Sequence, residues 1–339
     1  MRMKFLRPLL LGLICLTPAF GQMSGPRPAA PAKEATDSGD RHRFDQLERK
    51  IETLLWYEEI GDIAKISRIR YTSAPNRTKN PTGQGAGNPL IIPALTFVPR
   101  SLGDKKAPLL VFVHQGVHAH IDTIDSPIIR ELLEQGYVII APDYRGSTGY
   151  GGGFYSQIDY GATEIDDSHE ARTWAVENMP NVDPSRVGIM GFSHGGFHTL
   201  MNIFRWPADY QVAYAGVPVA DLVQRMGYKT QGYRDIYAEF IGKQAQDNPM
   251  EYRKRSPVYY ADKLATPLLI HANTNDEDVN VMEVEHLINA LKANGKDFEY
   301  KIYEDAPGGH VFNRLDTKLA KESRAEIYAF LARYLHPGN

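Results

Sequence analysis

The chain has 339 residues, of which 42% are hydrophobic and 10% aromatic. This is the composition of an ordinary globular protein with enough apolar side chains for a large core. Lysine and arginine total 38 against 41 acidic residues, giving a formal net charge of −3. Without a strong basic excess, the composition argues against a protein that binds nucleic acid through its phosphates.

The first 21 residues are predicted to be a signal peptide. A basic start with Arg2, Lys4 and Arg7 precedes an apolar stretch from Pro8 to Phe20, and small residues follow at its end. The apolar stretch is too short to span a bilayer, which favours cleavage near Gly21 over a retained membrane anchor. We therefore expect export to a bacterial periplasm or to the cell exterior, with no membrane contact after cleavage.

The residues that follow the signal peptide are predicted to be a disordered linker over 22–40, because they are rich in Pro, Ala, Gly and Ser. The only cysteine, Cys15, lies before the expected cleavage site. The mature chain is therefore expected to contain no disulfide, no thiolate nucleophile and no cysteine-bound metal. Residues 41–339 are predicted to form a single domain.

The domain is expected to begin with a helix and two antiparallel strands, over residues 41–107. The helix is indicated by one apolar face, and the strands by alternating or apolar runs at 63–71 and 89–98. The helix face comprises Phe44, Leu47, Ile51, Leu54 and Leu55.

From residue 108 to the C-terminus, short apolar runs alternate with helical stretches. The runs lie at 109–113, 137–141, 187–190, 212–215, 267–270 and 298–302. The helical stretches lie at 126–135, 164–178, 195–204, 281–294 and around 327–335. This alternation predicts an α/β fold with a mostly parallel central sheet and helices on both faces. Catalytic groups are then expected at the edge where the parallel strands end.

The sequence Gly191-Phe-Ser-His-Gly195 follows one of these apolar runs and precedes a helical stretch. A strand that turns into a helix through Gly-x-Ser-x-Gly is a nucleophile elbow of the α/β-hydrolase fold. Both glycines are expected because strand and helix pack too closely there for side chains. Ser193 is therefore the predicted nucleophile, and the backbone N–H of His194 is a predicted oxyanion donor.

The partners of the nucleophile are expected in the order Ser, acid, His. His310 follows two glycines just after the last predicted strand and is the predicted general base. Three acids, Asp276, Glu277 and Asp278, follow the run at 267–270. We predict that Asp276 orients the histidine and that Asp278 caps the following helix, with Asp278 kept as the alternative orienting acid.

The remaining site predictions concern loops. The second oxyanion donor is expected at Gly116 or Val117, in the loop after the first parallel strand. Five aromatic side chains are candidates for the wall of the substrate cleft, although they could equally serve only to pack their own segments: Tyr144, Tyr150, Phe154, Tyr233 and Phe240. No metal is expected, because no carboxylate lies at tight spacing beside His114, His118 and His120. No cofactor is expected, and the glycine-rich loop at 143–153 lacks the lysine of a phosphate-binding loop.

Several motifs together resemble the catalytic domain of the prolyl oligopeptidase (S9) family of α/β-hydrolases, from Leu109 to the C-terminus. They are GFSHGG, DYRGSTGYG, APGGH and, most diagnostically, NPMEYRKRSP at 248–257. The resemblance implies Ser193 as nucleophile, Asp276 as orienting acid and His310 as base. Family members commonly carry a β-propeller ahead of this domain, and no blade-like repeat precedes Leu109 here. The usual His-Gly-Gly-Pro oxyanion loop reads His-Gln-Gly-Val at 114–117, and the acid loop has one additional residue.

These features predict an exported serine hydrolase that forms an acyl-enzyme, with short peptides as the expected substrates. A carboxylesterase of the feruloyl or carbohydrate-ester type is the main alternative, because the gate and the acidic N-terminus anchors of propeller-bearing relatives are not seen. An acyltransferase and a non-catalytic binding relative are further alternatives. The sequence makes no prediction of oligomeric state.

Overall fold

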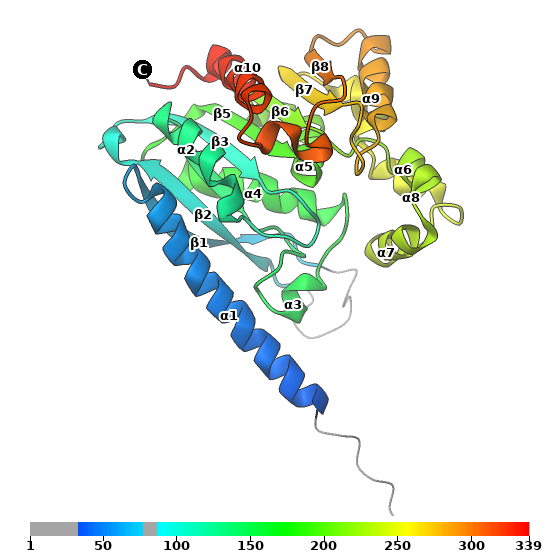
Figure 1. Cartoon of the computed structure of the whole chain (residues 1–339), viewed down its shortest axis with the longest axis horizontal. Helices are drawn as coiled ribbons and strands as arrows, with labels where there is room; N and C mark the ends of the chain where they lie inside the picture. The colour runs from blue at the N-terminus through cyan, green and yellow to red at the C-terminus, as the bar shows by residue number, and fades with distance from the viewer. Residues whose placement is uncertain (1–32, 77–86, 339) are drawn as a thin grey trace, which may run out of the picture. The chain divides into compact units, whose positions relative to one another are not determined.

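The computed structural model describes residues 33–76 and 87–338, with side chains from residue 43 onward (Figure 1). The predicted signal peptide and the predicted linker up to residue 32 lie outside the described residues. From Arg41 to Asn339 the chain forms one compact unit. Its centre is an eight-stranded sheet in the order β1-β2-β4-β3-β5-β6-β7-β8.

Helix α1 runs over Lys33–Ile60 and begins inside the predicted linker. The prediction of disorder was therefore wrong for residues 33–40. Lys, Glu and Ala at 33–35 all favour helix, so the helix extends back from the apolar part of the segment.

The first two strands join the main sheet rather than forming a separate layer. β1 (Ala64–Ser73) pairs with β2 (Leu90–Pro99) in antiparallel register, from Ala64 opposite Pro99 to Ser73 opposite Leu90. β2 then pairs antiparallel with β4 (Val138–Pro142) through four residues, Ala94 to Phe97. Among the described residues, this pairing is the one strand-to-strand link between the segment before residue 108 and the rest of the sheet.

The other strand pairs are all parallel. They join β4 to β3 (Ala107–Val113), and then β5 (Val182–Phe192), β6 (Val212–Gly216), β7 (Leu268–Asn273) and β8 (Glu299–Tyr303) in turn. Parallel strands end at the same edge of a sheet, so the residues that follow β5, β7 and β8 share one edge. The predicted mostly parallel sheet is confirmed.

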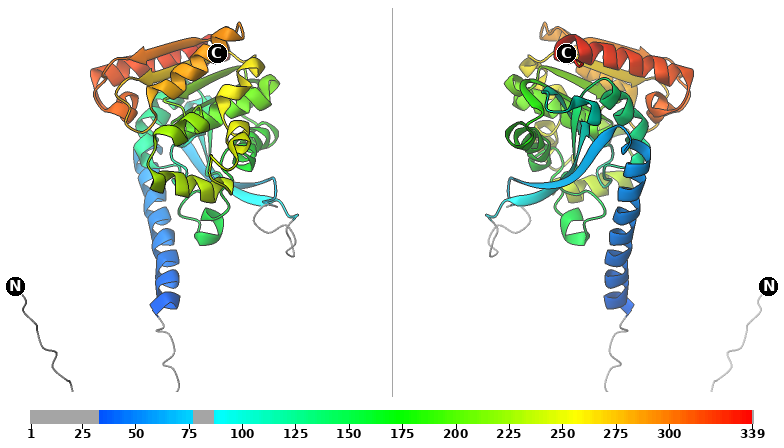
Figure 2. Two further views of the ribbon diagram at one scale, coloured as in Figure 1. Left: turned by 90° about the vertical axis from the view of Figure 1, so that its right-hand side faces the viewer. Right: turned by 90° about the vertical axis from the view of Figure 1, so that its left-hand side faces the viewer.

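Helices cover both faces of the sheet, as Figure 2 shows. Along β3, Leu109, Val111 and Val113 belong to one core, while Leu110 and Phe112 belong to the other. The first core is closed by α4 (Thr163–Asn178), α5 (His194–Arg205) and α9 (Val281–Ala293). The second is closed by α1, α2 (Ser126–Glu134) and α10 (Lys318–Leu335). Alternate side chains of β3 therefore have apolar partners on opposite faces of the sheet.

Four short helices were not predicted. α3 covers Gly152–Tyr155, and α6 (Leu222–Tyr228), α7 (Gln231–Ile241) and α8 (Pro249–Lys254) lie together between β6 and β7 (Figure 1). Among the helices of the described residues, none combines the length and the apolar character needed to cross a membrane.

Candidate active site

Ser193 occupies a strained turn between β5 and α5. Its φ of 56° and ψ of −118° are disfavoured for a residue with a side chain. The turn is fixed by a hydrogen bond of 2.8 Å from the Ser193 N–H to the carbonyl of Gly216 on β6. Ser193 is nearly enclosed, with 7% of its surface exposed.

The glycines beside Ser193 are required by close backbone contacts. A Cβ on Gly191 would lie 2.4 Å from the carbonyl carbon of Gly195, and one on Gly195 would lie 2.1 Å from the carbonyl oxygen of Val113. Both distances are far shorter than any real carbon contact. The sequence pattern around Ser193 thus has the predicted steric cause.

Asp276 and His310 follow β7 and β8 and meet above the same sheet edge. The His310 Nδ1 lies 2.7 Å from Asp276 Oδ2. The other carboxylate oxygen, Oδ1, accepts the backbone N–H groups of Asp278 and Val279 at 2.9 and 2.8 Å. With one oxygen held by its own loop, the carboxylate presents the second oxygen to the imidazole in a fixed orientation.

His310 is positioned by a turn that only glycine allows. Gly308 and Gly309 have φ values of 99° and 51°, and a Cβ on Gly309 would lie 2.2 Å from Glu277 Oε2. The same Glu277 oxygen accepts the backbone N–H of His310 at 3.4 Å. Glu277, for which the sequence suggested no separate role, therefore holds the main chain of the histidine.

Asp278 lies on the other side of the same imidazole. Its Oδ2 is 3.8 Å from His310 Nε2. The prediction that Asp278 caps the following helix was wrong, because the side chain of Asn280 accepts the N–H of Met282 at 3.0 Å and caps α9.

Within the described part of the chain, the Ser193 hydroxyl makes no hydrogen bond to His310. Such contacts are often long before substrate binds.

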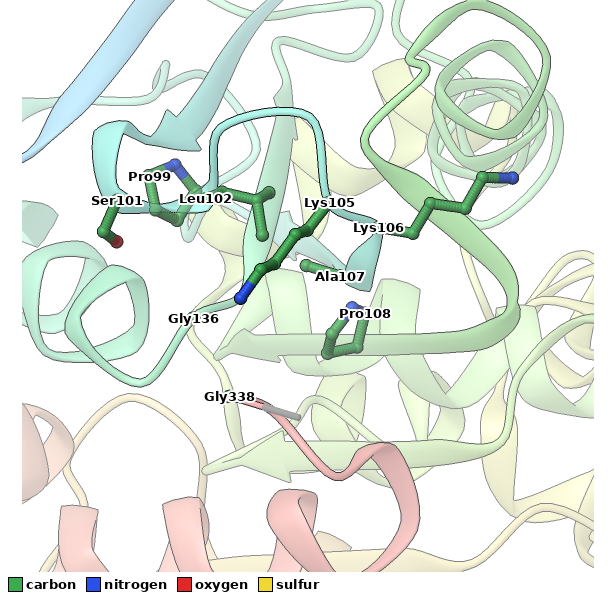
Figure 3. Close-up of a pocket in the computed structure, with 9 residues that line it drawn as sticks. All are labelled: Pro99, Ser101, Leu102, Lys105, Lys106, Ala107, Pro108, Gly136 and Gly338. Atoms are coloured by element: carbon green, nitrogen blue, oxygen red, sulfur yellow. The ribbon is translucent and has the colours of Figure 1, made fainter.

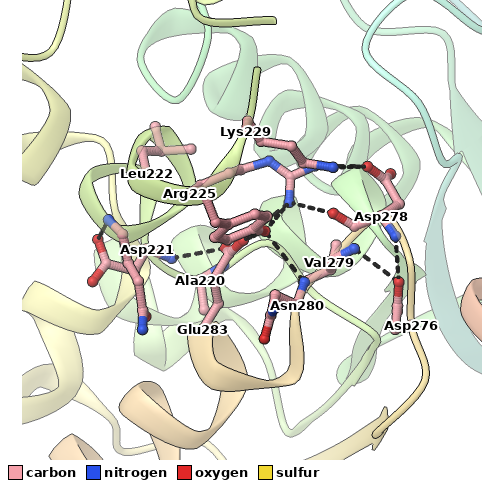
Figure 4. A network of polar contacts seen from close by, with 12 residues as sticks. Ala220, Asp221, Leu222, Arg225, Lys229, Asp276, Asp278, Val279, Asn280 and Glu283 are labelled. Carbon is pink, nitrogen blue, oxygen red and sulfur yellow. Dashed lines mark hydrogen bonds and ion pairs between the residues drawn. The ribbon is translucent and has the colours of Figure 1, made fainter. Parts of the chain in front are cut away.

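Arg225 on α6 ties the acid loop to α9 (Figure 4). Its side chain is 2% exposed and lies 3.1 Å from Asp278 Oδ1 and 3.0 Å from Glu283 Oε1. Lys229 contacts the same Asp278 oxygen at 2.9 Å. Burial alone would raise the pKa of Asp278. Arg225 and Lys229 lower it by a larger amount, so the pKa of Asp278 lies below its usual range. Asp278 is therefore held as a carboxylate.

The predicted oxyanion loop is held in place by Tyr144. The tyrosine hydroxyl donates to the carbonyl of Gly116, whose φ is 77°. The Tyr144 ring stacks on His114 at 4.2 Å, and burial lowers the pKa of His114 to about 3. Tyr144 is fully buried, so its prediction as a substrate contact is corrected: it packs beneath the loop. Val117 is partly buried against the core.

Tyr150 and Phe154, for which the sequence left a cleft role and a packing role equally open, lie beside the N-terminal segment. The Tyr150 hydroxyl donates to Asp143, and the guanidinium of Arg49 on α1 lies 3.6 Å above the ring. Tyr150 lines a cavity of about 400 Å³ beside β1 and β2, and Phe154 packs on it at 5.2 Å between ring centres. Tyr150 therefore contacts α1 instead of lining the predicted cleft, because aromatic residues of a glycine-rich loop can face either side.

Tyr233 and Phe240 on α7 belong to a cluster of aromatic rings next to the elbow. Ring centres lie 4.7 Å apart for Tyr233 and Tyr237, and 5.7 Å apart for Tyr237 and Phe240. Tyr160 joins this cluster to His194 at 4.7 Å. Two members that the sequence reasoning missed, Tyr155 and His118, stack at 3.6 Å, and His118 meets Phe240 at 5.1 Å.

Glu164 on α4 lies beneath the elbow among buried histidines. Its Oε1 accepts the N–H of Gly161 at 2.8 Å and lies 3.3 Å from His194 Nε2 and 3.7 Å from His198 Nε2. Burial raises the pKa of Glu164, but the two histidines lower it well below its usual range. These ligand atoms could also hold a metal ion.

Glu52, His120 and Asp122 form a second group of potential metal ligands. Glu52 on α1 lies 3.2 Å from His120 Nε2, which raises the pKa of His120. The prediction that no carboxylate lies close in sequence to the histidines after β3 was wrong for Asp122, which follows His120 by two residues. Local spacing could not reveal Glu52, because β1, β2 and β3 lie between it and His120.

A well-formed cavity of about 170 Å³ lies elsewhere (Figure 3). It is lined by residues at the start of β3, including Ala107 and Pro108, together with Gly136 and Gly338. β3 and β5 are parallel, so this cavity lies at the sheet edge opposite Ser193 and has no part in the candidate site.

The family model and the curated relatives point to the same protein family. The model of the prolyl oligopeptidase family matches residues 126–338. The chain is 30% identical over 214 residues to the uncharacterized peptidase YuxL of Bacillus subtilis, covering 62% of this chain and 32% of that protein. It is 28% identical to dipeptidyl aminopeptidase BIII of Pseudoxanthomonas mexicana, covering 68% of this chain and 34% of that protein. The chain therefore spans about a third of the length of these curated relatives.

Solved structures show the same fold. A puromycin-hydrolyzing peptidase of Mycobacterium tuberculosis matches with a TM-score of 0.68 and 24% identity, covering 80% of this chain and 39% of that one. An acylaminoacyl peptidase in complex with Z-Gly-Gly-Phe-chloromethyl ketone matches with a TM-score of 0.68 and 20% identity, covering 84% and 44% of the two chains. The predicted α/β-hydrolase fold is confirmed.

Proposed function

Because this chain belongs to the prolyl oligopeptidase family and is a serine hydrolase, we propose that it is an exported peptidase that cleaves short peptides through an acyl-enzyme. The observation that carries the proposal is the 2.7 Å contact between His310 Nδ1 and Asp276 Oδ2, above the sheet edge that also bears Ser193. The names of the relatives, an acylamino-acid-releasing enzyme and a dipeptidyl aminopeptidase among them, support substrates cleaved near the N-terminus of a peptide.

In the proposed mechanism, Ser193 Oγ attacks the scissile carbonyl while His310 Nε2 takes its proton. Asp276 fixes the imidazole tautomer through Nδ1 and stabilises the imidazolium. The backbone N–H of His194 and a donor near Gly116 bind the oxyanion, a contact whose loss typically lowers kcat by about 10²–10³. His310 then protonates the leaving amine, and water releases the acyl group by the reverse sequence of proton transfers.

The nucleophile is tested with a fluorophosphonate probe on the purified protein. We expect labelling that is lost in Ser193→Ala, while Ser168→Ala, a change at another buried serine, keeps its label. Absence of labelling in the native protein would favour the non-catalytic alternative.

The substrate class is tested by comparing N-acetyl-Ala, Ala-Ala and X-Pro anilides with p-nitrophenyl esters. Anilide turnover comparable to ester turnover supports the peptidase, and the best anilide identifies the preferred N-terminal group. Ester-only activity would support the carboxylesterase alternative. Product analysis with added alcohol or amine separates hydrolysis from acyl transfer.

A further inference from the structure

The outer face of α1 exposes a row of large apolar side chains. We call Phe44, Leu47, Ile51 and Leu54 the outer stripe; they are 67, 54, 57 and 69% exposed, respectively. Leu55 and Tyr57 beside them are 39 and 50% exposed. Single exposed apolar residues are ordinary, but a contiguous row of this kind marks an interaction surface.

The opposite face of α1 is already occupied by its own domain. Trp56 and Ile60 are buried in the core between α1 and the sheet, where the Trp56 and Phe97 rings lie 5.1 Å apart. Closer to the N-terminus of α1, Arg49 lies over Tyr150 and Glu52 contacts His120. One side of the helix thus contacts the domain, whereas the outer stripe is exposed. Figure 2 shows α1 at the outside of the domain.

The outer stripe has the spacing of a coiled-coil seam. Its members are three, four and three residues apart, which are the a, d, a and d positions of two heptads. In the same heptads Arg49 and Trp56 both fall at f, the position directly opposite the seam. The face of α1 that contacts the domain and the face that would bind a partner therefore lie on opposite sides of the helix.

The charges that flank the outer stripe favour a parallel copy of the same helix. In a parallel pair, a g residue faces the e residue five positions later in the partner, so Arg43 meets Glu48 with opposite charge, and Lys50 meets Leu55. In an antiparallel pair centred on the stripe, Lys50 would face Lys50 and Glu48 would face Glu48. The parallel arrangement pairs opposite charges and avoids both repulsions.

We propose that the outer stripe is the contact between two copies of this chain, which join their α1 helices as a parallel two-stranded coiled coil. Each domain then stands on the outside of its own helix. This contact is independent of the proposed peptidase function, because none of its residues belongs to the candidate site.

Mass measurement tests the proposal on the purified full chain in a Cys15→Ala background. We expect a dimer by light scattering or sedimentation, and a monomer for the double variant Leu47→Glu/Ile51→Glu. The matched control is Ile124→Glu, which changes an apolar residue that is 69% exposed in another element and should remain dimeric. All variants should keep the wild-type circular dichroism spectrum, since the changed residues are exposed.

Orientation is tested with a single engineered cysteine. Leu54→Cys places two thiols directly opposite each other in the parallel pair, whereas the antiparallel pair separates them by about 15 Å along the axis, too far for a disulfide. We expect oxidation to give a covalent dimer for Leu54→Cys but not for Ile124→Cys.

The proposal is overturned by a wild-type monomer up to about 100 µM, or by a dimer that survives Leu47→Glu/Ile51→Glu. A wild-type dimer without cross-linking at Leu54→Cys overturns the parallel arrangement. A wild-type monomer that binds anionic vesicles, with binding lost in the double variant, would identify the outer stripe as a membrane contact instead.

Discussion

Asp276 and Asp278 flank the same imidazole but are bound very differently. Asp276 gives one oxygen to His310 Nδ1 and the other to its own loop, whereas Asp278 is bound by Arg225 and Lys229. We predict that Asp276→Asn lowers kcat by about 10³–10⁴, because the amide cannot hold the required imidazole tautomer. Asp278→Asn should lower kcat by less than about tenfold. Steady-state kinetics on the preferred substrate measures both, and equal losses would contradict the assignment.

Asp125 gives the protein a pH-dependent stability. The residue is 4% exposed, and burial raises its pKa to about 7, despite the nearby Arg314. Since the folded pKa lies above the unfolded value, the stabilising contribution of Asp125 is complete below about pH 4 and is lost as the pH rises through 7. We predict that Asp125→Asn, which mimics the protonated acid, is more stable than wild type at pH 8 by roughly 2–4 kcal/mol.

Urea denaturation at pH 4 and pH 8 measures this difference. The two proteins should have similar unfolding free energies at pH 4, and the exposed Asp104→Asn should match wild type at both. A wild-type stability that is equal at the two pH values, together with an unchanged Asp125→Asn, would contradict a raised pKa for this carboxyl.

At the scale of single elements, the junction of β5 and α5 tolerates no side chain at its two glycines. Gly195→Ala would place Cβ 2.1 Å from the carbonyl oxygen of Val113 at the end of β3, so α5 and β3 must move apart. We predict a loss of at least about 2 kcal/mol in unfolding free energy and of at least about 10² in kcat. Gly232→Ala is the matched control, because nothing lies within 4 Å of that position on α7. It should stabilise the protein by up to about 1 kcal/mol.

Periodicity predicted most of the elements that bury an apolar face and missed those held by polar contacts. It also predicted α1, but the apolar face on which that prediction rested is exposed, and Trp56 and Ile60 pack on the domain instead. The eight strands and the helices behind them follow from apolar spacing. α6 and α7 are instead stabilised by Arg225, whose partners Asp278 and Glu283 lie more than fifty residues further along the chain. No local sequence pattern indicates a contact between residues this far apart in the chain.

In the candidate site, too, local sequence pattern predicted some contacts and missed those that depend on packing. The order of Ser193, Asp276 and His310 came from motif and spacing, and the structure brings Asp276 and His310 into contact. For Tyr144 and Tyr150 the sequence left open whether the ring lines the cleft or packs its own segment, because a loop sequence does not say which side a ring faces. The pairing of Glu164 with His194 was missed because it depends on how α4 packs against α5.

At the scale of the whole domain, α1 from Trp56 onward is part of the core, whereas its earlier turns are not. We predict that a chain starting at Arg43 unfolds within a few degrees of the full chain. A chain starting at Gly61 loses Trp56 and Ile60 and uncovers Phe97, so it should be insoluble or melt at least about 10 °C lower. Thermal melts of both truncations measure this, and equal melting temperatures would show that α1 is dispensable.

The four-residue seam between β2 and β4 sets the segment before residue 100 apart from the strands that carry the proposed catalytic groups. Among the described residues, it is the one strand pairing between that segment and the rest of the sheet, while side chains such as Trp56 in the core and Tyr71 on the carbonyl of Asp167 make further contacts. Strands β5, β7 and β8 pair with neither β1 nor β2. A change in β1 or β2 therefore reaches Ser193, Asp276 and His310 only through the strands between them or through side-chain packing.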